Sequence, residues 1–197
     1  MASEIEGVSL PEPVRRYVQR AIPAGPGAAQ SVRVTQTGEM ILKPGARPRP
    51  FTAFEDLATR HVSFTWTARF AMLGPLGLRV TDRYDGRDGT LEVRALGIPL
   101  QRRHGPNLAQ GEICRYLAEI AWVPHAILTN RQLEWRQLDE RTVEVATHSA
   151  EKRVAVQVIF NEAGEITQTV AERPRAEAGN ELTTWVGVYG TGLPRSW

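Results

Sequence analysis

The sequence is almost free of cysteine, and Cys114 is the only one among 197 residues. A disulfide within the chain is therefore excluded, which is typical of proteins in a reducing compartment. No run of about 18 apolar residues is present, so no segment is expected to span a membrane. Residues 1–7 lack the basic start and the apolar run of a secretory signal. These absences predict a cytoplasmic protein.

Lysine is also scarce, since Lys43 and Lys152 are the only lysines among 24 basic residues. The arginines are spread between acidic residues, and the net charge is only +2. Nucleic-acid binding needs a clustered basic stripe, which this distribution does not provide. We therefore expect no nucleic-acid partner.

The common catalytic and cofactor motifs are missing. The sequence has no G-x-S-x-G elbow, no P-loop and no G-x-G-x-x-G fingerprint. Its four histidines are scattered, without the H-E-x-x-H spacing of a zinc site and without a second cysteine. The sequence therefore predicts no metal and no cofactor.

One long segment in the middle of the chain, residues 105–124, has helical periodicity. Its apolar residues fall on one stripe, which is expected to be buried; they are Ile113, Leu117, Ile120 and Ala121. Pro106 and Pro124 match the start and stop signals of a helix. A shorter helix is predicted near the N-terminus, over residues 10–22, where Pro13 suits the first turn.

Most of the remaining chain alternates with period two, which is typical of strands. The clearest example is residues 61–72, and the segments after the central helix are joined by short polar breaks. Short connections require antiparallel neighbours. We predict a single α+β domain over residues 1–197, with a large, curved, half-barrel-like antiparallel sheet. An N-terminal helix accompanies this sheet, and the central helix packs on its concave face.

The polar side of the central helix is the main candidate site. Glu112 and Glu119 are two turns apart, about 10 Å, and Arg115 lies between them at a spacing that reaches either one. In a water-poor cavity these groups could act as an acid and a base, and Tyr116 could donate a hydrogen bond to the same ligand. The alternative is a solvated helix face with ordinary ion pairs.

Further residues could line a ligand pocket. Trp122 supplies a flat apolar wall on the polar side of the helix, and His104 precedes the helix in a predicted loop with Arg102 and Arg103. Asp82 is a polar residue on an inward strand face, either a catalytic carboxylate or a strand-end residue. The remaining aromatic candidates are Phe64, Trp66, Phe70, Trp185 and Tyr189, for which core packing is the alternative role.

Two segments resemble the signature stretches of a family of small bacterial proteins of unknown function. They are Leu10–Tyr17 (LPEPVRRY) and Gly111–Pro124, which fits the pattern G-E-x-x-R-Y-L-A-E-x-x-W-x-P; Trp185–Gly190 resembles a third stretch. The resemblance implies that Glu112, Arg115, Tyr116, Glu119, Trp122 and Pro124 belong to the defining motif. The order of strands and helices is also similar to lipoprotein carriers of the LolA/LolB type, in which a half-barrel holds acyl chains.

Three functions are compatible with these patterns. The first is binding of an apolar or amphipathic small molecule between the curved sheet and the central helix. The second is a cofactor-free hydrolase, lyase or isomerase that uses Glu119 as base and Glu112 as acid, with Tyr116 or Arg115 stabilising charge. The third is an interaction protein with an open sheet edge, which would allow a homodimer to form.

Overall fold

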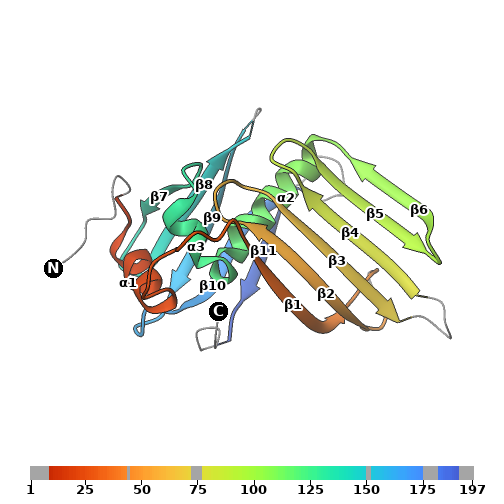
Figure 1. The fold of residues 1–197 in the computed structure, drawn as a ribbon, viewed down its shortest axis with the longest axis horizontal. Coiled ribbons are helices and arrows are strands. Elements are labelled where there is room, and N and C mark those ends of the chain that lie inside the picture. Colours follow the sequence, from red (N-terminus) through yellow and green to blue (C-terminus); the bar gives the residue numbers. More distant parts are fainter. Residues whose placement is uncertain (1–8, 44, 72–76, 150–151, 175–181, 191–197) are drawn as a thin grey trace.

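The computed structural model describes residues 9–43, 45–71, 77–149, 152–174 and 182–190. Two antiparallel sheets carry most of this chain (Figure 1). The first sheet has six strands in sequence order: β1 (Ser31–Met40), β2 (Arg49–Ala58), β3 (Phe64–Ala71), β4 (Gly77–Tyr84), β5 (Gly89–Ala95) and β6 (Ile98–His104). Each strand pairs with its neighbour in the chain, so the sheet is a simple meander.

The second sheet has five strands, again paired in sequence order: β7 (Glu134–Gln137), β8 (Thr142–His148), β9 (Arg153–Phe160), β10 (Ile166–Pro174) and β11 (Leu182–Val188). Neither sheet closes into a barrel. The predicted antiparallel α+β fold is confirmed, with its strands divided between two sheets.

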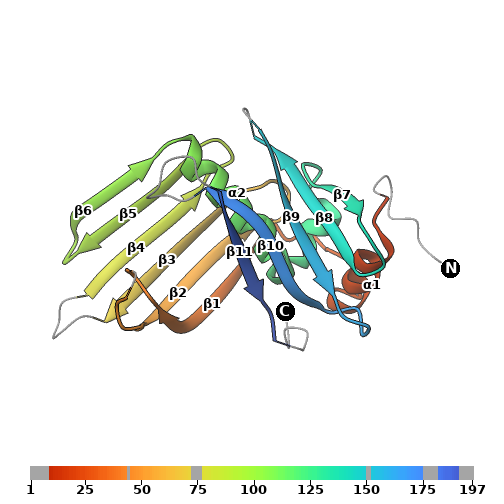
Figure 2. The same cartoon turned by 180° about the vertical axis from the view of Figure 1, so that it is seen from behind.

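The helices lie between and beside the sheets (Figures 1 and 2). They are α1 (Glu12–Ala21), α2 (Pro106–Ala118), the 3-10 turn η1 (Glu119–Trp122) and α3 (Pro124–Thr129). Helix α2 contacts β9 and β10 of the second sheet and β4, β5 and β6 of the first. It is therefore the element through which the two sheets pack together. No helix in the described ranges is long and apolar enough to cross a membrane.

The first sheet has an inner face toward α2 and an outer face toward solvent. Alternation puts Phe64, Trp66, Ala68 and Phe70 of β3 on the inner face, where all four are buried. Arg69 of the same strand points outward and is exposed. The inner-face residues join the apolar sides of α1, α2 and β9 in one core cluster, because each element buries only one of its faces.

A close approach fixes α2 against β5. A Cβ atom added to Gly89 would lie 2.8 Å from the backbone N and Cα of Ala109. Only glycine therefore allows the first turns of α2 to lie on the start of β5.

Two local predictions need correction. The central helix does not continue to Pro124: α2 ends at Ala118, η1 follows, and Pro124 begins α3 instead of ending a helix. Proline is favoured at the first position of a helix because its fixed φ suits that site and no partner is needed for its missing N–H.

The stretch Arg102–His104, predicted as a loop, belongs to strand β6. Leu96 (φ 51°) and Gly97 (φ 80°) form the tight turn that returns the chain along β5. Pro99 argues against a strand when only the sequence is considered. Proline is tolerated there because β6 is an edge strand.

Candidate functional site

The side chain of Arg115 occupies the centre of a buried acidic cluster. Its Nη1 lies 3.0 Å from Asp82 Oδ2, and its Nη2 lies 3.2 Å from Glu55 Oε1. Its Nε donates to Glu119 Oε1 over 3.1 Å. The cluster comprises the carboxyl groups of Glu55, Asp82, Glu112 and Glu119, and three of these four surround one guanidinium group. Within the described residues, no group of three or more histidine, cysteine or acidic residues is arranged to hold a metal ion.

The strand register explains why Glu55 and Asp82 meet Arg115. Glu55 of β2 and Asp82 of β4 are both direct neighbours of Trp66 on β3. All three lie on the inner face, so the sheet presents carboxyl, indole and carboxyl side by side. Helix α2 crosses above this row and places its arginine over it.

Aromatic rings form the floor under the guanidinium group. The Cζ atom of Arg115 lies 4.7 Å from the ring centre of Trp66 and 5.2 Å from that of Phe64. Trp66 donates from Nε1 to Gln36 Oε1 over 2.7 Å, and Gln36 Nε2 donates to Glu55 Oε2 over 2.7 Å. The rings stabilise the positive charge, and the glutamine holds Glu55 in place.

The carboxyl groups of Glu112 and Glu119 are protonated far more readily than free glutamate. Burial raises the pKa of Glu112 to about 8, and the charge of Asp82 contributes to the rise. Burial also raises the pKa of Glu119 well above its ordinary value, against the lowering effect of Arg115, and Glu55 adds to the rise. Burial therefore favours the protonated form of both groups.

A second arginine lies beside the cluster. The four carboxyl groups face Arg115 and also Arg173 of β10, whose Nη2 lies 3.7 Å from Glu112 Oε1. Three carboxyl oxygens of the cluster have no hydrogen-bond donor in the described structure; they are Glu55 Oε1, Asp82 Oδ1 and Glu112 Oε2.

The cluster is not sealed from solvent. The side chains of Arg115, Asp82 and Glu119 keep 15%, 11% and 11% of their surface exposed, whereas those of Glu55 and Glu112 keep 0% and 1%. The exposed part of the cluster is therefore formed by Arg115, Asp82 and Glu119.

A family model described as a family of unknown function (DUF6544) matches residues 1–191. The chain belongs to this family. No curated protein and no solved structure matches the chain. What this DUF6544 chain does must therefore be inferred from its own geometry.

Tyr116 does not join the acidic cluster of this DUF6544 chain, although it was predicted to share a ligand with Glu112. Its hydroxyl donates to the carbonyl oxygen of Ala58 over 2.7 Å and accepts from Asn130 Nδ2 over 3.3 Å. The side chain is fully buried. Because Tyr116 lies on a different side of α2 from Arg115, it ties the helix to the end of β2 instead.

Trp122 and Tyr189 meet at the end of η1. Their rings pack edge to face with centres 6.2 Å apart, and Tyr189 donates its hydroxyl hydrogen to the carbonyl oxygen of Ala118. Burial raises the pKa of Tyr189 to about 12. Trp185 is half-buried and packs against the core from β11. These aromatic side chains fasten the end of the helix to the second sheet.

The other predicted pocket residues lie at different depths. Phe64 and Trp66 lie beside the acidic cluster, with their rings packed against the guanidinium group of Arg115. Phe70 lies further along β3, buried, with its ring centre 5.5 Å from that of Phe51. His104 is exposed at the end of β6, away from the carboxyl groups around Arg115.

Three residues of the site were not identified from the sequence: Glu55, Gln36 and Arg173. A signal for Glu55 existed, since Ala53, Glu55 and Leu57 alternate with Phe54 and Asp56 along β2. That alternation places a carboxyl group in register with two apolar residues. Gln36 and Arg173 carry no such signal, because each is recruited by a partner distant in the sequence.

Proposed function

We propose that this chain binds an amphipathic small molecule whose head group is cationic or donates hydrogen bonds. The observation that supports this proposal is that each of the three nitrogen atoms of the Arg115 guanidinium group, Nε, Nη1 and Nη2, already faces a carboxyl group. An anionic head group would find the three nitrogen atoms of Arg115 already facing carboxyl groups, and it would itself meet those carboxyl groups. A donor finds carboxyl oxygens that lack a partner, Asp82 Oδ1 among them.

An apolar surface continues from the cluster along the inner face of the first sheet. Asp82, Val80 and Leu78 alternate on this face of β4, and Val80 and Leu78 are half-buried. Phe51 is half-buried on the same face, opposite Phe70. At about 3.3 Å per residue, this surface extends about 13 Å from Asp82 to Leu78. An alkyl chain has room to lie on it while its head group contacts the carboxyl groups.

The head group is tested by calorimetric titration of octylamine and octanoate, two probes with matched chains and opposite charge. We expect octylamine to bind and octanoate to bind at least about tenfold more weakly, because only the amine donates hydrogen bonds to carboxyl oxygens such as Asp82 Oδ1. The variant Asp82→Asn should weaken octylamine binding, whereas Asp56→Asn, on the exposed outer face of β2, should not. Equal binding of both probes would contradict the proposal.

A second candidate function is acid–base catalysis without a cofactor, and the raised pKa values of Glu112 and Glu119 favour it. The sequence predicts Glu119 as base and Glu112 as acid, and burial favours the protonated form of both groups. The charge of Asp82 contributes to the raised pKa of Glu112, so these two carboxyl groups interact within the cluster. Hydrolysis of p-nitrophenyl octanoate that is lost in Glu112→Gln, while octylamine still binds, would support catalysis over binding alone.

A third candidate function is pairing of a second copy at β11. In the described structure this strand pairs only with β10, and Leu182, Val186 and Val188 are exposed on it. Such an edge can pair with another strand. Sedimentation velocity of the protein and of Val186→Lys tests this: a homodimer should appear and be lost in the variant.

A further inference from the structure

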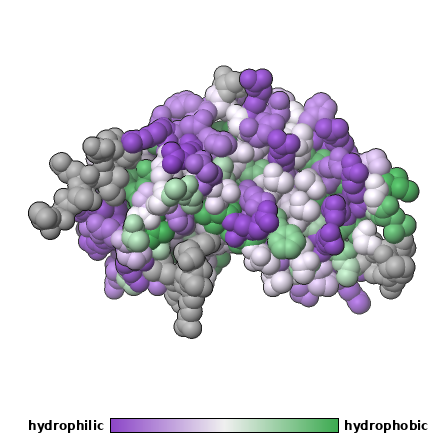
Figure 3. Space-filling view, viewed as in Figure 1, coloured by the Kyte–Doolittle hydropathy of each residue, from purple (hydrophilic) through white to green (hydrophobic). Residues whose placement is uncertain are grey.

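Exposed apolar side chains gather at one end of the first sheet. This hairpin end comprises the β1–β2 connection and the β5–β6 turn, which lie at the same end of the antiparallel meander (Figure 1). Its exposed large apolar residues are Met40, Ile41, Leu42, Leu96, Ile98 and Leu100. In Figure 3, hydrophobic side chains gather at the right-hand margin, where Figure 1 places the β5–β6 turn.

The apolar residues of the β5–β6 turn are well exposed. Leu96, Ile98 and Leu100 keep 64%, 63% and 62% of their surface exposed. Three large aliphatic residues within five positions are costly to leave in water, since burial of each apolar side chain is favourable. This turn is therefore suited to enter an apolar phase.

Pairing of β6 with a strand of another copy does not account for this exposure. Pro99 removes a backbone donor from β6, and the register shifts at Val93 and Arg94, where the strand bulges. Proline and bulges on an edge strand prevent the addition of a further strand. The surface is thus protected from β-pairing while its side chains remain exposed.

A row of arginines crosses the outer face beside this turn. Arg69, Arg79 and Arg94 are direct cross-strand neighbours on β3, β4 and β5. They line a cavity of about 370 Å³ together with Leu78 and Leu96. Arg94 pairs with Glu92, but Arg69 and Arg79 have no ion-pair partner among the described residues. Like charges placed directly opposite one another destabilise a sheet, so an anion bound here would relieve the repulsion.

We propose that the hairpin end docks on an anionic bilayer surface. The arginine row contacts lipid phosphates, and the side chains of the β5–β6 turn enter the boundary between head groups and acyl chains. A second copy is a poorer occupant, because two such basic faces would repel each other. Lys43 and Arg49 near the end of β1 and the start of β2 add positive charge.

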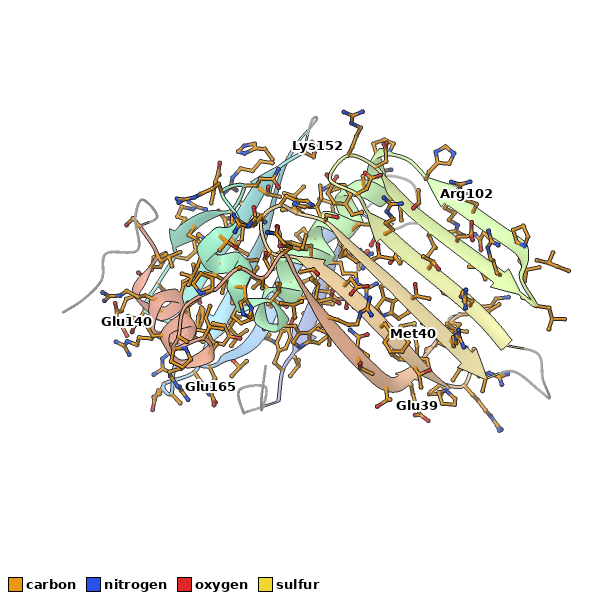
Figure 4. All side chains as sticks on the ribbon, in the orientation of Figure 1. Glu39, Met40, Arg102, Glu140, Lys152 and Glu165 are labelled. Atoms are coloured by element: carbon orange, nitrogen blue, oxygen red, sulfur yellow. The ribbon has the colours of Figure 1, made fainter. Side chains whose placement is uncertain are left out.

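Two acidic residues lie near this surface without reversing its charge. Glu92 is engaged by Arg94, and Glu39 stands beside Met40 at the end of β1 (Figure 4). Arg102 of β6 is labelled in the same figure and lies opposite Glu92. The surface therefore stays basic, and it is distinct from the acidic cluster around Arg115, so docking does not depend on the proposed ligand.

Vesicle co-sedimentation of the full chain tests this inference. Vesicles of phosphatidylcholine with 30% phosphatidylglycerol should bind the protein at low salt, vesicles of phosphatidylcholine alone should bind it much more weakly, and 0.5 M NaCl should release it. Arg69→Gln with Arg79→Gln should lower the affinity about thirtyfold, from about 1 kcal/mol per arginine. Ile98→Ser with Leu100→Ser should lower it by at least about tenfold.

Matched variants separate docking from general charge or hydrophobicity. Arg60→Gln with Arg87→Gln removes two exposed arginines from the opposite end of the same sheet, and Phe54→Ser with Leu138→Ser removes two exposed apolar side chains elsewhere. Both should bind vesicles like the unaltered protein. Equal binding to neutral vesicles, or equal losses in the matched variants, would overturn the proposal, as would no sedimentation with either vesicle.

Discussion

Asp82 Oδ2 and Arg115 Nη1 lie 3.0 Å apart, and this contact joins the middle of the first sheet to α2 across 33 positions of sequence. Both groups are nearly buried, and each has further partners in the acidic cluster. The contact therefore couples the packing of the central helix to the protonation of the carboxyl groups around it. The stability of the fold and the chemistry of the site should respond to the same substitutions.

Replacing Arg115 by methionine should destabilise the protein by about 3–5 kcal/mol, because the buried carboxyl groups lose their shared counter-ion. Urea unfolding measures this change. Arg141→Met provides the matched control, since Arg141 pairs with Glu162 on the surface and such pairs contribute less than about 1 kcal/mol. Similar losses in both variants would show that Arg115 acts through packing alone.

The free energy of unfolding should fall as pH rises from about 5 to 8. A carboxyl group with a raised pKa stays protonated in the folded protein at pH values where it is ionised in the unfolded chain. Between the ordinary value of 4.5 and about 8 for Glu112, the folded state thus binds the extra proton. Each such proton contributes up to about 1.4 kcal/mol per pH unit.

Urea unfolding at a series of pH values tests this dependence. The variant Glu112→Gln should reduce the slope, because glutamine mimics the protonated acid at every pH. Glu162→Gln, at an exposed position, should leave the slope as it is. A slope that Glu112→Gln does not alter would mean that this carboxyl group titrates alike in both states.

Replacing Tyr116 by phenylalanine should cost stability without affecting the acidic cluster. The carbonyl oxygen of Ala58 and the amide of Asn130 would lose their buried partner, a cost of about 1–3 kcal/mol. The affinity for octylamine and the pH slope of unfolding should both be unchanged. A weaker affinity for octylamine with little loss of stability would instead indicate that Tyr116 contributes to ligand binding.

Substituting alanine for Gly89 should detach the start of α2 from β5. The added Cβ would meet the backbone of Ala109 at 2.8 Å, and overpacking of this kind costs about 1–3 kcal/mol or more. Gly77→Ala is the control, since a Cβ at Gly77 meets nothing within 4 Å. Thermal unfolding of the two variants should separate them clearly, and equal melting temperatures would contradict this account of the helix contact.

Local patterns in the sequence predicted much of the fold. Alternation along β3 identified its buried face, and the spacing of Glu112, Arg115 and Glu119 identified the polar side of the central helix. Strand β6 was not predicted from the sequence because Pro99 interrupts the alternation. An exposed edge strand also has no buried face, so its sequence lacks an apolar period of two. The end of the helix at Ala118 was not predicted because the apolar stripe continues through η1 without a break in its helical period.

The sequence by itself determined which residues of each element face inward, because burial periodicity is a local property of a helix or a strand. Only the tertiary structure decided which of the inward polar residues meet. In the tertiary structure Tyr116 hydrogen-bonds to Ala58, outside the acidic cluster, whereas Glu55 and Asp82 of two different strands contact Arg115. The physical reason is that a buried charge requires partners, and those partners come from whichever elements pack against it.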